Sequence, residues 1–263
     1  LENLDKISDS MARAQIWGAA WDATRDGESS ATDFIDLVLN NTAKENQGTM
    51  LITLLRQLVT TTKIYTAPEK RADAIVSVCG RLLDLAAQAA PGSDNQLLFT
   101  RFATYFANTK EHGDVLEGLL TGKVVFEGLK VDQDMRWDLI NGLVMEGRYA
   151  QAEIDAELEK DNTANGAKQA IMARTSIRTA EAKKAGWDHV VNNTELSNTE
   201  INFGCLGLVR DHDAKLLVPM VDWYFDAALK VWNTRTFKIA EYILRGAYPF
   251  YLANSELAER TRS

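Results

Sequence analysis

The sequence predicts an all-α protein, an irregular α–α superhelix of about thirteen antiparallel helices. Apolar residues recur at helical spacing from end to end, and residues typical of helix starts and stops bracket each run. The links between runs are only a few residues long, which makes successive helices antiparallel neighbours. No strict repeat period is visible, so the pattern favours a degenerate solenoid over a consensus repeat array.

The first half of the chain contains six apolar runs with start or stop signals. The runs extend over Met11 to Trp21, Phe34 to Val38, Met50 to Val59, Ala72 to Ala86, Leu98 to Phe106 and Val115 to Leu120. The signals beside them are Ser8, Asp9, Gly27, Ser30 with Asp33, Pro68, Pro91, Gly92 and Gly122. Each signal suits the helix end at which it stands, so we expect six helices here.

Seven further runs follow in the second half. They extend over Met135 to Val144, Ile154 to Leu158, Ala167 to Arg174, Trp187 to Val190, Ile201 to Val209, Leu217 to Trp232 and Ile239 to Leu244. Gly147, Thr179, Pro249 and a capping box, Ser197 with Glu200, bracket them. Only Lys123–Val131 has the composition of a strand, and one strand cannot form a sheet.

Composition excludes several classes of protein. The 263 residues are 46% hydrophobic and 25% charged, unlike a disordered or collagen-like chain. No apolar run approaches the roughly 20 residues of a membrane-spanning helix, so we expect a soluble chain. The net charge of −8 disfavours nucleic acid and anionic membranes as partners. Two cysteines cannot form a disulfide scaffold.

The ends of the sequence and its lack of linkers bear on domain organisation. Leu1 stands where an initiator methionine is usual, and Leu1, Leu4 and Ile7 already have helical spacing. Asn254 and Ser255 open a last helix pattern that runs to Ser263. No stretch rich in Pro, Gly or Ser divides the chain. We therefore predict one helical domain over residues 1–263 that is a piece of a longer polypeptide; a trimmed full-length protein is the alternative.

Residues able to bind metal or act as nucleophiles are scarce. His112, His189 and His212 have neither a histidine four residues on nor a nearby cysteine. Cys79 and Cys205 lie 126 residues apart on apolar helical faces, which is typical of buried free thiols. No Gly-x-Ser-x-Gly motif or phosphate-binding glycine loop is present. We predict no catalytic residue and no metal ligand in this chain.

The segment Asp211-His212-Asp213 is the closest approach to a metal-binding motif. It stands at a predicted helix end, where polar side chains usually cap the helix. Capping is therefore the preferred interpretation.

Acidic residues are concentrated between Asp132 and Asp161, where nine acids face three bases. The preferred interpretation is a solvated face with acids stabilised at helix starts. An electrostatic rim that attracts cationic peptides or a basic partner is the alternative. A stand-alone enzyme that uses these carboxylates as acid and base is a third reading. Lys230 to Arg262 has the opposite balance, with six bases against three acids, which predicts a polarised molecule.

Two short segments place an arginine and a tryptophan beside carboxylates. In Asp132-Gln-Asp-Met-Arg136-Trp137 the carboxylate stands four residues before the arginine, and Trp21-Asp22-Ala-Thr-Arg25-Asp26 is similar. A carboxylate paired with a partly buried arginine beside tryptophan is more typical of helix packing than of an active site. We expect both segments to be packing clamps.

These residues also resemble a known family. The resemblance rests on Ile16–Asp26, Asp132–Trp137, Ala152–Ile154, Asp161–Gly166, Lys183–Trp187 and Ile239–Tyr242 with Pro249. In this order they are similar to the C-terminal helical domain of aminopeptidase N, in the actinobacterial type related to the endoplasmic-reticulum aminopeptidases. The likeness covers essentially the whole chain.

The resemblance implies an armadillo/HEAT-like superhelix that closes over the catalytic domain of a zinc aminopeptidase. It implies that this chain is the non-catalytic C-terminal domain of a cytoplasmic bacterial enzyme, with the same polypeptide's catalytic domain and peptide substrates as partners. Its role would be to wall the substrate chamber and regulate peptide access.

The family's zinc-binding and amine-binding motifs are absent from this sequence. Gly142 to Gly147 only mimics the second of them, in a helical segment. Zinc is therefore expected only in the parent's catalytic domain, no substrate-binding residue is assigned, and the chain alone should be inactive. The alternative is a free-standing helical-repeat scaffold that binds a partner protein.

Overall fold

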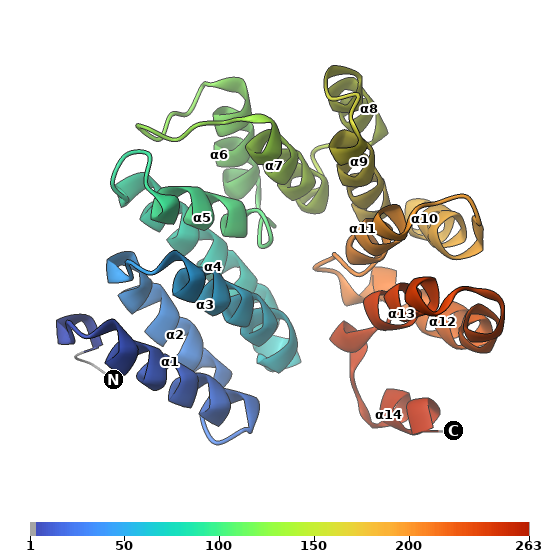
Figure 1. The fold of residues 1–263 in the computed structure, drawn as a ribbon, viewed down its shortest axis with the longest axis horizontal. Coiled ribbons are helices and arrows are strands. Elements are labelled where there is room, and N and C mark those ends of the chain that lie inside the picture. Colours follow the sequence, from blue (N-terminus) through green and yellow to red (C-terminus); the bar gives the residue numbers. More distant parts are fainter. Residues whose placement is uncertain (1–3, 263) are drawn as a thin grey trace. The chain divides into compact units, whose positions relative to one another are not determined.

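The structure is a computed structural model that describes residues 4–262, and it is helical throughout (Figure 1). Among these residues there are fourteen α-helices and no β-strand. The predicted all-α class is confirmed. Contacts between Cα atoms divide the chain into two compact units, residues 1–135 and 136–263, and each is described by itself. That residues 1–263 form one domain stays a prediction.

The first unit is a two-layered stack of helices. Its elements are α1 (Ser10–Arg25), α2 (Ala31–Asn41), α3 (Gly48–Thr60), α4 (Pro68–Gln88), α5 (Asp94–Ala103) and α6 (Lys110–Thr121). Helix α1 packs on α2, α2 on α3 and α4 on α5, while α3 also contacts α1 and α5, and α2 contacts α4 (Figure 1). Odd-numbered helices therefore form one layer and even-numbered ones the other, as in an α–α solenoid. The central position of α3 explains why Leu51, Leu54, Leu55 and Leu58 are fully buried.

Local side-chain bonds begin most of these helices where the sequence predicts. The side chains of Asp9, Ser30, Ser93 and Thr109 each accept a hydrogen bond from a backbone N–H of the first turn. Pro68 is the first residue of α4, as predicted. Gly122 has a positive φ of 78° at the end of α6, a conformation that glycine adopts without strain.

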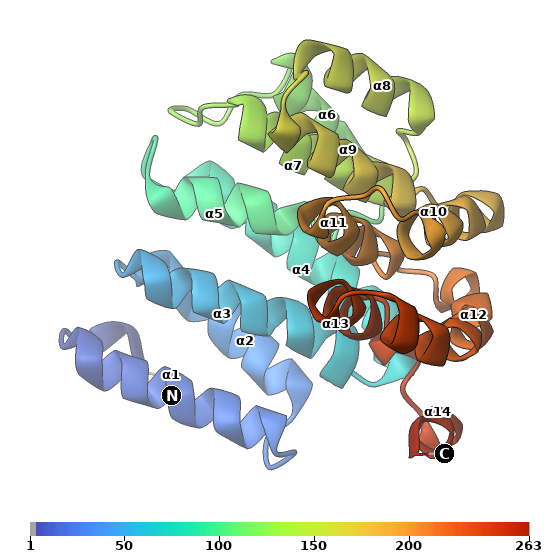
Figure 2. The same ribbon diagram turned by 45° about the vertical axis from the view of Figure 1, so that its right-hand side comes forward.

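The second unit repeats the two-layered arrangement. Its elements are α7 (Gln133–Glu146, beginning at the end of the first unit), α8 (Gln151–Lys160), α9 (Ala164–Ser176), α10 (Ala180–Asn192), α11 (Asn198–Leu208), α12 (Ala214–Thr234), α13 (Phe237–Gly246) and α14 (Ser255–Arg262). Helix α11 contacts both α9 and α13, and α10 contacts α12 (Figure 2). Thr179 and the Ser197–Glu200 capping box begin α10 and α11 as predicted.

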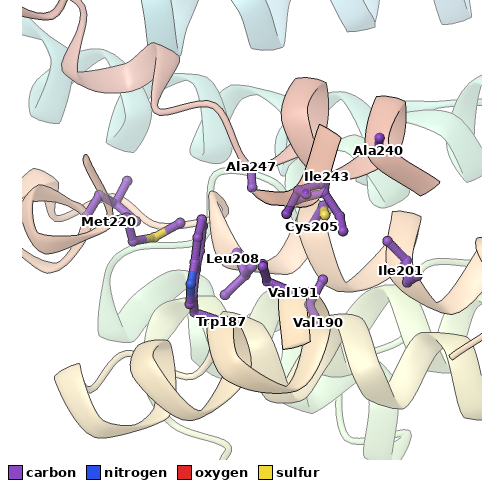
Figure 3. Packing of buried hydrophobic residues seen from close by; sticks show 12 residues of the cluster. Trp187, Val190, Val191, Ile201, Cys205, Leu208, Met220, Ala240, Ile243 and Ala247 are labelled. Carbon is purple, nitrogen blue, oxygen red and sulfur yellow. The ribbon is translucent and has the colours of Figure 1, made fainter. Parts of the chain in front are cut away.

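Glycines bring α9 and α11 unusually close. A Cβ atom at Gly207 would collide with Thr175 Oγ1 and with the carbonyl oxygen of Met172, both on α9. Beside this contact, Trp187, Val190, Cys205, Leu208 and Ile243 join one buried cluster (Figure 3). The close approach allows side chains from four helices, α10 to α13, to share this core.

The one segment with the composition of a strand, Lys123–Val131, is not a strand. Residues 123–131 form a loop between α6 and α7. Its backbone groups bond to the preceding helix and to a side chain instead of to a strand: Val124 N donates to Gly118 O, and Gln96 Nε2 donates to Glu127 O. A solitary extended segment has no ladder partner, so its polar groups are satisfied elsewhere.

The helix pattern predicted at the C-terminal end is confirmed as α14. Asn254 Oδ1 accepts a hydrogen bond of 2.7 Å from Leu257 N. None of the described helices is both long and apolar enough to span a bilayer.

Candidate functional site

Two of the acids between Asp132 and Asp161 are buried and bind the predicted clamp residues. Arg136 donates from Nε and Nη2 to the two Glu157 oxygens, each at 2.6 Å. Trp137 Nε1 donates to Asp161 Oδ2 at 2.8 Å. The predicted pairing of Arg136 with Asp132 is wrong, because Asp132 instead caps the start of α7 by accepting from Met135 N. The segment is a packing clamp, but its carboxylates come from α8, which contains Glu157, and from the residue that ends it, Asp161.

Other acids of this stretch also have structural partners. Asp155 accepts a 2.7 Å hydrogen bond from Arg174, which holds the pKa of Asp155 below its ordinary value. Glu153 accepts from Ala150 N at the start of α8, and Glu159 is exposed. The preferred solvated-face reading is therefore wrong for the buried Glu157 and Asp161. Whether the exposed acids form an electrostatic rim stays a prediction.

The corresponding clamp of the first unit uses residues that the sequence did not single out. Arg25 pairs with Asp22 and Asp26 but is half exposed, so the predicted clamp at Trp21–Asp26 is wrong. The buried equivalent is Glu45, which accepts from Arg13 Nη2 at 3.0 Å and from Trp17 Nε1 at 3.3 Å. Burial acts to raise the pKa of Glu45, but these hydrogen bonds outweigh it and the pKa is lowered.

A buried ionic cluster in the second unit was also missed. The Lys183 side chain is fully buried, and its Nζ donates to the carbonyl oxygens of Thr175, Gly207 and Leu208 at 3.1–3.4 Å. These carbonyls end α9 and α11, where the helix dipoles favour a cation. Asp211 Oδ2 lies 3.6 Å from Lys183 Nζ. Burial lowers the pKa of Lys183 to about 8, against the attraction of Asp211.

Two residues of the Asp211-His212-Asp213 segment have structural roles, Asp211 in this cluster and Asp213 at a helix start. Asp211 also lies 3.4 Å from Arg178 Nε, and Asp213 caps α12 by accepting from Lys215 N. Capping by Asp213 was predicted, whereas the buried role of Asp211 was not. No sequence pattern indicated that Asp211 pairs with a buried Lys183, because a lysine on a helix is usually solvated.

The described residues do not fit a zinc site. Within residues 4–262, no three His, Cys, Asp or Glu side chains come together as a possible metal-binding group. Cys79 and Cys205 are buried free thiols, as predicted, and burial raises the pKa of Cys205 to about 12. Such thiols are poor nucleophiles and poor metal ligands at neutral pH.

The best candidate for ligand binding is a groove between α3 and α5 in the first unit. This α3–α5 groove has a volume of about 390 Å³. Its lining residues are Ile52, Arg56, Val59, Thr60, Leu98, Arg101, Phe102 and Tyr105. The rings of Phe102 and Tyr105 stack with centroids 5.6 Å apart. The lining therefore combines two arginines with aromatic and aliphatic side chains, and none of the lining residues is acidic.

The chemistry of the groove suits a carboxylate attached to an apolar group. Arg56 is exposed and makes no ion pair within the described part of the chain. Guanidinium groups bind carboxylates with two parallel hydrogen bonds. Arg56 and Arg101 are 45 residues apart in the sequence, so only the packing of α3 beside α5 reveals the site.

A second groove, in the other unit, is electrostatically different. It lies between α9 and α10, has a volume of about 270 Å³ and includes Arg174 and His189. Asp155 already neutralises Arg174 here. The α3–α5 groove, where Arg56 has no such partner among the described residues, is thus the better anion site.

Comparison with known proteins identifies the family to which the chain belongs. The model of the family described as "ERAP1-like C-terminal domain" matches residues 1–262. The chain belongs to this family. It is also 34% identical over 260 residues to aminopeptidase N of Streptomyces lividans. The match covers 99% of this chain and 30% of that protein, so the ERAP1-like C-terminal domain spans less than a third of its curated relative.

Membership confirms the resemblance stated from the sequence. The motifs behind that resemblance include Trp137 and Lys183, both fully buried in the ERAP1-like C-terminal domain. Both residues hold helices together, by the bonds to Asp161 and to the ends of α9 and α11. Their roles are structural, and the family likeness therefore rests partly on core contacts.

Proposed function

We propose that this ERAP1-like C-terminal domain is the non-catalytic part of a zinc aminopeptidase, which removes N-terminal residues from peptides. The observation that supports this most directly is the family match over residues 1–262, together with the 34% identity to an aminopeptidase N. In this proposal the domain walls the substrate chamber and regulates peptide access, and the catalytic domain of the same polypeptide is its partner.

The α3–α5 groove gives the domain a means of binding the substrate's far end. An aminopeptidase acts on the amino end of a peptide, so a wall distant from the reaction would meet the carboxyl end. Arg56 and Arg101 would bind the terminal carboxylate, while Phe102 and Tyr105 would contact the last side chain.

Zinc belongs elsewhere in the proposed enzyme, because the described residues offer no set of ligands. The isolated chain should therefore contain no stoichiometric zinc and should not hydrolyse aminoacyl-arylamides. Elemental analysis and an arylamide assay check this expectation, and chelator-sensitive turnover would contradict it. We place the enzyme in the cytoplasm, since both cysteines are free thiols, which are typical of reducing compartments.

The groove is tested in the complete polypeptide with the double variant Arg56→Gln, Arg101→Gln. The KM for a peptide with a free carboxyl terminus should rise about tenfold, since about 1.4 kcal/mol of charge-assisted binding is lost. The KM for the same peptide amidated at its C-terminus should not change. Arg25→Gln, which removes an exposed arginine of the same unit, is the matched control.

Two results would count against the proposal. An unchanged KM for the free-acid peptide in the double variant, or an equal rise for the acid and amide peptides, would remove the role of the groove. An open reading frame without a His-Glu-x-x-His segment before Leu1 would favour a free-standing helical scaffold instead.

A further inference from the structure

An exposed apolar corner lies where α12 is followed by α13 in the second unit. Leu229, Trp232 and Phe237 are 71%, 54% and 70% exposed. The rings of Trp232 and Phe237 meet edge to face, with centroids 6.2 Å apart. Leu229 and Trp232 stand three residues apart and so share a helix face. These three exposed residues are here named the α12–α13 corner.

The same helices bury other apolar side chains, so the exposure of the corner is specific. Val231 on α12 and Ala240 and Ile243 on α13 are 1–3% exposed within the core. Contact with a partner would remove this apolar surface from water, which favours a complex. A leucine, a tryptophan and a phenylalanine together on one surface are typical of an interaction site.

Two basic residues, Lys230 and Arg235, stand beside the corner in the sequence. Lys230 and Arg235 make no ion pair with any carboxylate among residues 4–262. Arg235 Nη2 instead donates to the carbonyl oxygens of Val191 and Asn193, both at 2.7 Å, which holds its guanidinium group at the end of α10 without neutralising it. A complementary surface would have an apolar centre and carboxylates around it.

We propose that the α12–α13 corner is covered by the rest of the aminopeptidase chain, through an apolar pocket with acidic residues at its edge. The inference rests on the proposed function. The match covers only 30% of the Streptomyces relative, so most of such an enzyme lies outside this chain and must contact it somewhere. The corner supplies the aromatic anchors and the uncompensated charge that such a contact uses.

Cysteine labelling in the complete polypeptide tests the proposal. Leu229→Cys and Phe237→Cys are the test variants, and Val125→Cys, at a side chain 75% exposed in the first unit, is the control. Cys79 and Cys205 are 0% exposed and give little background. Cysteines at positions 229 and 237 should react with a maleimide at least tenfold more slowly than the cysteine at 125. In the isolated chain all three should react at similar rates.

Three results would overturn the proposal. The first is equal labelling of the three cysteines in the complete polypeptide. The second is protection of 229 and 237 in the isolated chain by a dimer visible in sedimentation. The third is protection that requires anionic lipid vesicles. Labelling needs no substrate, so loss of the proposed activity and failure of this inference are separate outcomes.

Discussion

Each unit binds an arginine and a tryptophan to buried carboxylates, but the two units differ in how many buried charged groups they contain. In the first unit one carboxylate, that of Glu45, accepts hydrogen bonds from both Arg13 and Trp17. In the second unit two carboxylates divide the task, with Glu157 bound to Arg136 and Asp161 to Trp137. The second unit adds the Lys183–Asp211 pair, so its interior depends more heavily on buried charge.

This difference has a thermodynamic consequence. A buried ion pair gains little over an apolar core, but removing one partner leaves a charge without compensation and is strongly destabilising. The second unit therefore has more positions at which one substitution is severe. In the first unit the largest loss of stability is expected at Glu45, because its carboxylate accepts hydrogen bonds from two side chains.

The largest expected effect is at Lys183. Lys183→Ala leaves the buried Asp211 with one ion pair among the described residues, to Arg178, and removes the cation from the ends of α9 and α11. The free energy of unfolding should fall by about 3–5 kcal/mol in urea titrations. Lys184→Ala, at the neighbouring half-exposed lysine, should change it by less than about 0.5 kcal/mol. Similar losses from both variants would mean that the buried cluster does not stabilise the unit.

The next largest effect compares the first unit, where one carboxylate binds both the arginine and the tryptophan, with the second unit, where two carboxylates do so. Glu45→Ala should cost about 3–4 kcal/mol, because Arg13 loses its carboxylate partner and Trp17 loses its acceptor, whereas Asp161→Ala should cost about 2 kcal/mol. Chemical denaturation of both variants measures the difference. An equal loss of unfolding free energy in the two variants would show that dividing the bonds between two carboxylates does not reduce the cost of removing one of them.

The pH dependence of stability sharpens the contrast further. Burial lowers the pKa of Lys183 to about 8 in the folded chain, below the ordinary value of 10.5. Between these values the unfolded chain binds more protons, so this group makes stability rise with pH. From pH 7.5 to 9.5 the wild type should gain about 1–2 kcal/mol relative to Lys183→Met. A constant difference between the two proteins across this range would contradict the shifted pKa.

The smallest effect is expected at Arg25. Its ion pairs with Asp22 and Asp26 are solvent-exposed, so Arg25→Gln should leave the urea midpoint unchanged. Arg13→Gln in the same helix should lower the midpoint measurably, since Glu45 is only 3% exposed. If both variants behave alike, the clamp at Glu45 contributes nothing beyond a surface pair.

Much of the fold was predictable because helix starts are local. Asp9, Thr179 and Ser197 each bond to a backbone N–H within three residues, so the residues that form the cap stand together in the sequence. The α3–α5 groove was not predictable in this way. Arg56 and Arg101 each sit on an ordinary amphipathic helix, and only the layering of α3 beside α5 places them on one groove.

The sequence by itself determined the helical class, the positions of the helices and the family. It did so because apolar spacing, capping and family motifs are all read along the chain. Only the tertiary structure decided which carboxylate meets which cation. Glu45 lies 32 residues from Arg13, and Glu157 lies 21 residues from Arg136. Such partners are chosen by the faces that helices bury against one another, and nearby acids such as Asp22 and Asp132 remain at the surface or at a helix end.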